Sequence, residues 1–135
     1  SRRKDPLADT RKLLASNGSL RVGLVRGSPL SIVGDPISPY AYGIGLELGR
    51  ALAHRLDVPM TPVLFARGTE MVDALRDGRI DIAFTTFSPE RAKDLVFTAP
   101  YLHMELGYLV PAGSSAKSIA DIDRAAMRVG VGAGS

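Results

Sequence analysis

Apolar and polar positions divide the middle of the chain into alternating strand and helix patterns. Branched apolar residues alternate with other residues over 20–25, which predicts a first strand. Apolar positions over 44–56 are spaced by four, three, one and four residues, the period of an amphipathic helix. The pattern also predicts a strand over 60–65, a helix with Thr69 as its N-cap, and a buried strand over 80–84. This order makes two βαβ units and predicts an α/β fold, a parallel doubly wound sheet with flanking helices.

The remaining segments carry shorter patterns. Three prolines and a glycine predict a loop over 28–42, with an extended stretch around 32–33. Gly78 is predicted to end the second helix as its C′ residue. The other predicted elements are a short helix over 6–16, a brief extended segment over 95–97, strands over 106–110 and 127–131, and a short helix over 118–124.

The segments that follow the three strands are expected to share one edge of the sheet. In open parallel sheets, ligands bind beyond the carboxyl ends of the strands. Ser28 follows the first strand, Gly68 follows the second, and Thr86 and Arg91 follow the third. The topology therefore predicts that a binding site at this edge would draw on these residues.

Arg91 has an unusual place in its local pattern. Ser88 is predicted to be the N-cap of a short helix, with Pro89 at N1 and Glu90 at N2, so that Arg91 falls at N3. The helix dipole disfavours a cation in the first turn, and the free N–H groups there suit an anion. Arg91 is therefore a candidate anion-binding residue. The alternative is that it pairs with Asp94 or Glu90 on a solvated turn.

Composition excludes several classes of protein. The 135 residues are 45% hydrophobic and 23% charged, as in ordinary globular domains, and no apolar run approaches the ~20 residues of a membrane span. The net charge of +3 comes from the first thirteen residues, so the rest is neutral and nucleic-acid binding is not expected. The sequence shows no signal-peptide pattern, which leaves the compartment open.

No catalytic or metal-binding constellation is visible. The chain has no cysteine, and His103 has no partner at metal-ligand spacing. No Ser/His/Asp arrangement is found, and Asp81, inside a buried strand, is interpreted as a structural acid. We therefore expect no catalytic residue, no cofactor and no metal.

Four stretches resemble the first lobe of the type-2 periplasmic solute-binding proteins, in the family (family 3) that serves polar amino acid uptake. The last two, in their order and spacing, are the most specific part of the resemblance, which runs from about residue 10 to the end. The stretches are Leu-Arg-Val-Gly-Leu-Val over 20–25, the glycine-rich helix start over 43–53, Ala-Leu-Arg-Asp-Gly-Arg-Ile-Asp-Ile over 74–82, and Ser-Pro-Glu-Arg-Ala-Lys over 88–93 followed by Phe-Thr-Ala-Pro-Tyr over 97–101.

The resemblance implies ligand-binding roles for individual residues. Arg91 would bind a ligand α-carboxylate through its planar guanidinium, and Thr86 would support that carboxylate with its backbone N–H and hydroxyl. The backbone carbonyl of Phe84 would accept the ligand ammonium. Gly134 and Ser135, in the turn that ends the chain, would offer a second anion-binding nest.

The resemblance also implies a division into domains. Residues 1–19 would be a leading basic segment with a short helix, and residues 20–109 the first solute-binding lobe. Residues 110–113, Val-Pro-Ala-Gly, look like a hinge, so that 114–135 would be the incomplete start of a second lobe.

The implied function is that of an extracytoplasmic, periplasmic solute-binding protein. Such a protein closes its lobes on a small carboxylate-bearing solute, here an amino acid, and presents it to the membrane permease of an ABC transporter. Enzyme activity is not expected. Two alternatives stay open: a dehydratase on a cyclic carboxylate that uses Arg91 and a general acid from the second lobe, and a sensor or interaction domain that forms a homodimer through its exposed interlobe face.

Three positions depart from the family pattern. The family often has Asp or Asn where Val25 stands, and aromatic residues near Ser28 and Gly68 that enclose the ligand side chain. Their absence implies a larger ligand, a different ligand or a lobe with reduced binding. Tyr40 and Tyr42 lie in the proline-rich loop, where they are interpreted as packing residues, with closure over the site as the alternative.

Overall fold

The computed structural model describes residues 4–124 and 126–133, in two compact units. The first unit contains the described residues up to Leu95 together with Ala133, and the second contains Val96–Gly132. None of the helices in these described residues is long and apolar enough to cross a membrane. The functional division at 110–113 stays a prediction.

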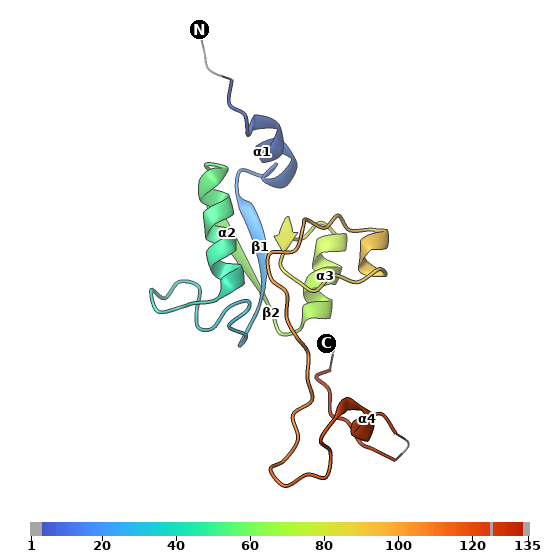
Figure 1. Ribbon diagram of the computed structural model, residues 1–135. Coiled ribbons are helices and arrows are strands. Elements are labelled where there is room, and N and C mark those ends of the chain that lie inside the picture. The colour runs from blue at the N-terminus through green and yellow to red at the C-terminus, as the bar shows by residue number, and fades with distance from the viewer. Residues whose placement is uncertain (1–3, 125, 134–135) are drawn as a thin grey trace. The chain divides into compact units, whose positions relative to one another are not determined.

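The first unit is built on a parallel sheet of three strands. They are β1 (Leu20–Val25), β2 (Met60–Phe65) and β3 (Ile82–Ala83), in the order β2-β1-β3 (Figure 1). β1 pairs along its whole length with β2, from Leu20 opposite Met60 to Val25 opposite Phe65. The structure therefore confirms the predicted bounds of the first two strands and the parallel sheet.

The third strand is shorter than the predicted 80–84. The amide of Asp81 still donates to the backbone carbonyl of Arg21 at 2.9 Å, but the amide of Arg21 donates to the carboxylate of Asp81, at 2.8 Å, and not to a backbone carbonyl of this segment. Regular pairing with β1 therefore covers only Ile82 and Ala83.

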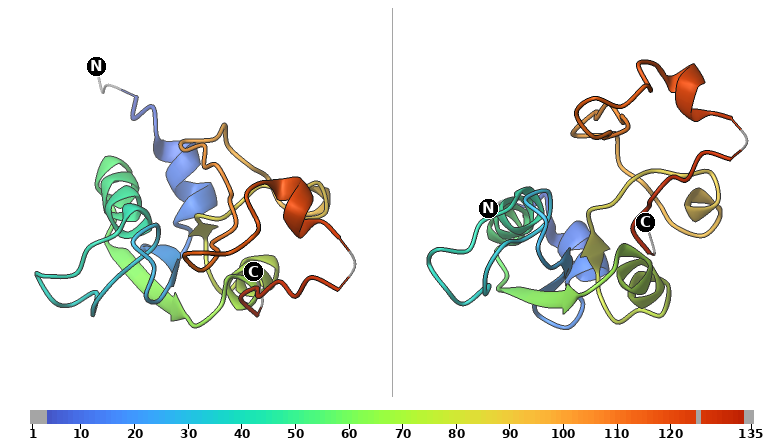
Figure 2. Two further views of the ribbon diagram at one scale, coloured as in Figure 1. Left: turned by 60° about the horizontal axis from the view of Figure 1, so that its bottom comes forward. Right: turned by 90° about the horizontal axis from the view of Figure 1, so that it is seen from below.

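Two helices cover opposite faces of the sheet. Alternate side chains of β1 pack on α2 (Ile44–Arg55), and the other face packs on α3 (Gly68–Arg76) (Figures 1 and 2). Helix α2 comes so close to the sheet that a Cβ on Gly49 would lie 2.9 Å from a methyl group of Val22. The predicted doubly wound α/β arrangement is confirmed. The buried residues shared between β1 and α2 are Leu20, Val22, Leu24, Leu46, Ala53 and Leu56.

The start of α3 differs from the prediction. Arg67, which has an extended backbone, is the N-cap, and the helix begins at Gly68, after two residues that separate it from β2. Thr69 therefore lies inside the first turn and is not the N-cap. At the other end, Gly78 has φ +72°, as predicted for a C′ glycine.

The loop between β1 and α2 is fastened to the helix that follows it. Gly43 precedes α2 with φ +152°, and a Cβ at that position would lie 2.2 Å from the carbonyl oxygen of Ser31. Val33 and Tyr42 exchange backbone hydrogen bonds of 2.7 and 3.1 Å. Three amides of the first helical turn donate to loop carbonyls at 3.0–3.1 Å, from Ile44 to Pro29, from Gly45 to Leu30 and from Leu46 to Ser31.

The chain before β1 forms the predicted leading helix, α1 (Ala8–Leu14). Arg11 in this helix donates a hydrogen bond from Nε to the carbonyl of Leu56, the residue after α2. This contact ties the leading segment to the first unit.

The second unit contains one short helix and no strand among its described residues. The helix is α4 (Ile119–Ile122), capped by Ser118, within the predicted 118–124. The strands predicted over 106–110 and 127–131 are wrong, since the structure has no strand there. A strand needs a neighbour for its backbone hydrogen bonds, and Leu106 and Leu109 are 90% and 101% exposed, so no layer within the unit covers this segment.

Asp81 is held by Arg21 in a two-pronged ion pair. Nε of Arg21 lies 3.1 Å from Oδ2 and Nη2 lies 2.8 Å from Oδ1, and the Asp81 side chain is 11% exposed. Burial acts to raise the pKa of Asp81, but the hydrogen bonds from Arg21 outweigh it and hold the pKa below its usual range. The interpretation of Asp81 as a structural acid is confirmed.

Replacement of Asp81 by asparagine is expected to lower the free energy of unfolding by about 2 kcal/mol, because it removes charged hydrogen bonds. Asp77→Asn is the control, since the Asp77–Arg79 pair is exposed and 3.4 Å long and should change stability by less than about 0.5 kcal/mol. Because the folded pKa is lowered, the contribution of Asp81 is present above the unfolded pKa of about 4 and is lost as the pH falls through the folded value. Urea unfolding should therefore separate wild type from Asp81→Asn at pH 7 and bring them together in acid; equal midpoints at pH 7 would contradict this role.

Candidate functional site

A pocket of about 400 Å³, lined mostly by polar side chains, lies between α3 and the segment that follows β3 in the first unit. One wall comes from α3, with residues spaced by three, one and three positions along one helical face. The other wall comes from the segment after β3 and the 3₁₀ helix η1 (Arg91–Lys93). The lining residues are Thr69, Val72, Asp73, Arg76, Thr86, Ser88, Glu90 and Arg91.

The local structure at Arg91 differs from the prediction in one respect. Glu90, not Ser88, is the N-cap of η1, although the Ser88 hydroxyl still accepts the Arg91 amide at 3.1 Å. The next two amides also have partners, from Ala92 to the Ser88 carbonyl and from Lys93 to the Glu90 carbonyl. The amides of Arg91, Ala92 and Lys93 are therefore occupied, and the capacity of this turn to bind an anion lies in the guanidinium of Arg91.

One nitrogen of that guanidinium is fixed by two threonines. Nη1 of Arg91 donates to the Thr85 hydroxyl at 2.9 Å and to the Thr86 hydroxyl and carbonyl at 3.1 and 3.2 Å. Within the described residues, no hydrogen bond or ion pair occupies Nε or Nη2. Arg21 uses the same two atoms, Nε and Nη2, to grip the carboxylate of Asp81. The corresponding edge of Arg91 is thus available for a carboxylate.

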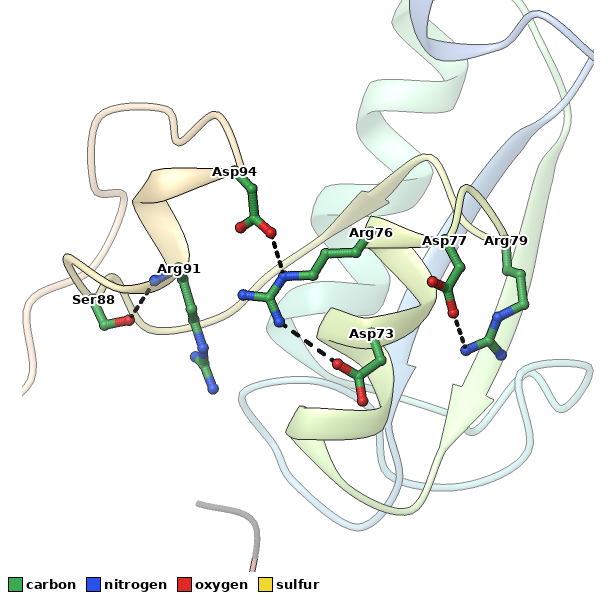
Figure 3. A network of polar contacts seen from close by, with 7 residues as sticks. All are labelled: Asp73, Arg76, Asp77, Arg79, Ser88, Arg91 and Asp94. Carbon is green, nitrogen blue, oxygen red and sulfur yellow. Dashed lines mark hydrogen bonds and ion pairs between the residues drawn. The ribbon is translucent and has the colours of Figure 1, made fainter.

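The predicted alternative, in which Arg91 pairs with Asp94 or Glu90, does not occur among the described residues. Oδ2 of Asp94 lies 2.9 Å from Nε of Arg76, and Arg76 also approaches Asp73 at 3.6 Å (Figure 3). The Arg91 side chain extends from η1 in a different direction, away from Asp94 (Figure 3).

The other predicted site residues lie outside this pocket. Phe84 is half-buried and packs against the core between β1 and α2. Ser28 uses its hydroxyl and carbonyl within its own turn, to the amides of Leu30 and Ser31. Gly68 begins α3 but does not line the pocket. Two further predicted residues, Gly134 and Ser135, lie outside the described part of the chain.

The face of α3 was missed by the sequence analysis. Asp73 is 65% exposed and lines the pocket beside Arg76. A signal was present, because Thr69, Val72, Asp73 and Arg76 follow the i, i+3, i+4, i+7 spacing of one helical face. The pattern was used to predict the helix, but not to place this face opposite Arg91.

A second hollow of about 360 Å³ lies where the β1–α2 loop meets α2. Tyr42 lines this hollow and is held there by its backbone hydrogen bonds to Val33. Tyr40 is 88% exposed. Neither tyrosine lines the pocket that contains Arg91.

The described residues contain no group of three or more His, Cys, Asp or Glu side chains placed to hold a metal ion.

Comparisons with known proteins agree with this fold. Among solved structures, an ancestral cationic amino acid solute-binding protein is similar with 28% identity and a TM-score of 0.58, over 69% of this chain and 41% of that chain. An ancestral cyclohexadienyl dehydratase is similar with 25% identity and a TM-score of 0.57, over 76% of this chain and 41% of the other. An ancestral amino acid-binding protein described as a precursor of cyclohexadienyl dehydratase has 29% identity and a TM-score of 0.56, over 69% and 41%.

The chain spans 41% of the length of these solved structures. No match was found among curated protein sequences. The profile of the family described as "Bacterial extracellular solute-binding proteins, family 3" matches residues 20–128, which is most of the chain. The predicted resemblance is confirmed, and the chain belongs to family 3 of the bacterial extracellular solute-binding proteins.

Proposed function

We propose that this chain forms the first lobe, with the start of a second, of a periplasmic protein that binds a small carboxylate-bearing solute, an amino acid. Arg91 and Thr86 carry the recognition of the carboxylate. The proposal is finer than family membership alone, because it names the chemical group that is bound and the residues that bind it.

The observation that carries the proposal is the half-occupied guanidinium of Arg91. The threonine contacts to Nη1 reduce the freedom of the side chain, while Nε and Nη2 keep two parallel donors for a carboxylate. A preorganised donor pair loses less conformational entropy on binding than a mobile side chain does. Arg91 therefore combines charge, geometry and restraint in one pocket.

Thr86 adds a donor next to that pair. Its hydroxyl oxygen accepts a hydrogen bond from Arg91 at 3.1 Å, so its own proton stays available to donate to a ligand. Thr86 is also exposed and lines the pocket. These features support its role beside Arg91 at the carboxylate.

Two further observations support an amino acid as the solute. The carboxylates of Asp73 and Glu90 line the same pocket as Arg91, so the pocket offers charges of both signs, as a zwitterion requires. Two of the similar solved structures are described as amino acid-binding proteins, one of them for cationic amino acids.

In the cell, the complete protein would close two lobes around the solute and deliver it to the permease of an ABC transporter. The chain alone would bind weakly, because affinity in such proteins depends on contacts from both lobes. Association of two chains through the exposed interlobe face is a further proposal, which light scattering over a range of concentrations would test.

The decisive experiment is an NMR titration of the ¹⁵N-labelled chain with the common amino acids and with the matching carboxylic acids that lack the amino group. We expect the Nε–H resonance of Arg91 to shift, with millimolar affinity, and the amino acids to bind more tightly than their desamino analogues. Absence of any Arg91 response across the panel would refute the proposal. Micromolar affinity would refute the dependence on a second lobe.

A second candidate is a dehydratase acting on a cyclic carboxylate, which the similarity to an ancestral cyclohexadienyl dehydratase favours. Arg91 would hold the substrate carboxylate, and a general acid would have to come from elsewhere in the complete protein. Turnover of a cyclohexadienyl carboxylate by the complete protein, lost on Arg91→Ala, would favour this candidate over transport.

A further inference from the structure

A carboxylate stands close to Arg91 in the sequence, at the C-cap of the same short helix, but does not pair with it. In a 3₁₀ helix, side chains three residues apart lie on the same face. Asp94 directly follows η1 and stands three residues after Arg91. An ion pair between them would occupy the guanidinium with an internal anion.

Arg76 takes this carboxylate instead. Its Nε lies 2.9 Å from Oδ2 of Asp94, and its Nη1 lies 3.6 Å from Oδ1 of Asp73 (Figure 3). The Arg76 side chain is 34% exposed, against 55% and 65% for its two partners, so the arginine is the less solvated member of both pairs. The charge of Arg76 is thus balanced by two carboxylates, while Arg91, the other cation that lines the pocket, keeps its charge for a ligand.

We propose that Arg76 is a positioning residue, which holds Asp94 away from Arg91 and so keeps the guanidinium edge of Arg91 open to a ligand carboxylate. This inference rests on the proposed function, in which Arg91 binds that carboxylate. The threonines orient Arg91 from one side, and Arg76 removes the competing anion on the other. Each half of the arrangement comes from a different element, α3 and the segment that follows β3.

The inference is tested with Arg76→Ala and with the double variant Arg76→Ala/Asp94→Asn. Acetate at constant ionic strength is the probe, and its dissociation constant is read from the Nε–H resonance of Arg91. In Arg76→Ala, Asp94 is released to compete, and acetate binding is expected to weaken by about two- to fivefold, the range for exposed ion pairs. In the double variant, the competing charge is gone and binding should return to near the wild-type value.

Arg79→Ala is the matched control. This variant also removes one positive charge, three residues further along the chain. Because Arg79 pairs with Asp77 outside the pocket, its replacement should leave acetate binding unchanged. Arg76→Ala should also shift the Arg91 Nε–H resonance without ligand, and the double variant should restore it. The weakening in Arg76→Ala should fade in 0.5 M salt, because the competing pair is exposed.

Three outcomes would overturn the inference. The first is unchanged binding in Arg76→Ala. The second is a double variant as weak as Arg76→Ala, which would mean that Arg76 acts on the ligand or on the fold and not through Asp94. The third is an equal loss of acetate affinity in Arg79→Ala, which would mean that the effect of Arg76→Ala comes from the change in net charge alone. If acetate and amino acids fail to bind the wild type, the proposed function is wrong, while the ligand-free resonance still decides whether Arg76 keeps Asp94 from Arg91.

Discussion

Replacement of Arg91 by alanine is expected to abolish detectable binding of carboxylate-bearing solutes by this chain. Each charged hydrogen bond contributes about 1.5–3 kcal/mol, so the loss of two weakens binding by about 100-fold or more. Because a single lobe is expected to bind only with millimolar affinity, this weakening would raise the dissociation constant beyond the range that an NMR titration can measure. Backbone amide shifts of the pocket residues would report it, since the Arg91 Nε–H resonance is absent from the variant.

Two further variants make this result specific. Arg91→Lys keeps the charge but not the two-pronged geometry, and it should weaken binding by about tenfold. Arg55→Ala removes an exposed arginine at the end of α2 and should change nothing. Thermal unfolding of each variant would show that the fold persists. If Arg91→Ala bound amino acids as the wild type does, the carboxylate site would have to be sought elsewhere.

Replacement of Gly43 by alanine is expected to lower the free energy of unfolding by about 3 kcal/mol, through backbone strain and overpacking. The backbone at this position has φ +152°, and a Cβ would lie 2.2 Å from the Ser31 carbonyl oxygen and 2.9 Å from the Cα of Ile32. Both contacts are to backbone, so no side chain can rotate to relieve them. The chain has no tryptophan, so urea unfolding would be followed by circular dichroism.

Gly68→Ala is the matched control for that experiment. A Cβ on Gly68 would meet nothing within 4 Å, and its φ lies outside the left-handed region. This substitution is therefore expected to stabilise the fold by about 0.5 kcal/mol, because alanine restricts the unfolded chain. Equal stability of Gly43→Ala and Gly68→Ala would show that the loop can move away from α2 at little cost.

Periodic sequence patterns correctly predicted the elements whose packing partners lie within the first unit. β1, β2 and α2 have long patterns whose apolar faces meet within the unit, so pattern and structure agree. β3 was predicted too long at its start because the side chain of Asp81 accepts the Arg21 amide in place of a backbone carbonyl, which periodicity does not reveal. The strand predicted over 106–110 has an apolar pattern but no neighbour in its unit to pair with, and pattern alone does not supply one.

The sequence also pointed to only one wall of the candidate site. Arg91 and Thr86 could be identified because sheet topology and family resemblance place both residues after the third strand. The α3 wall was missed because its members are far from Arg91 in sequence and have an ordinary helical pattern. The partner of Asp94 was also beyond prediction, since three basic residues, Arg76, Arg91 and Lys93, compete for it and only the fold selects Arg76.

Only part of the β1–α2 loop is hydrogen-bonded to the start of α2, so different parts of the loop should differ in how well they tolerate added residues. The stretch 29–31 supplies the carbonyls that accept the first amides of α2, so an inserted residue there would leave helix amides without partners. The tip over 37–40 makes local turn contacts, and Ile37 and Tyr40 are 90% and 88% exposed. A fluorescent label or short tag is therefore better placed at the tip, where it would leave both the helix start and the pocket on the far side of the sheet intact.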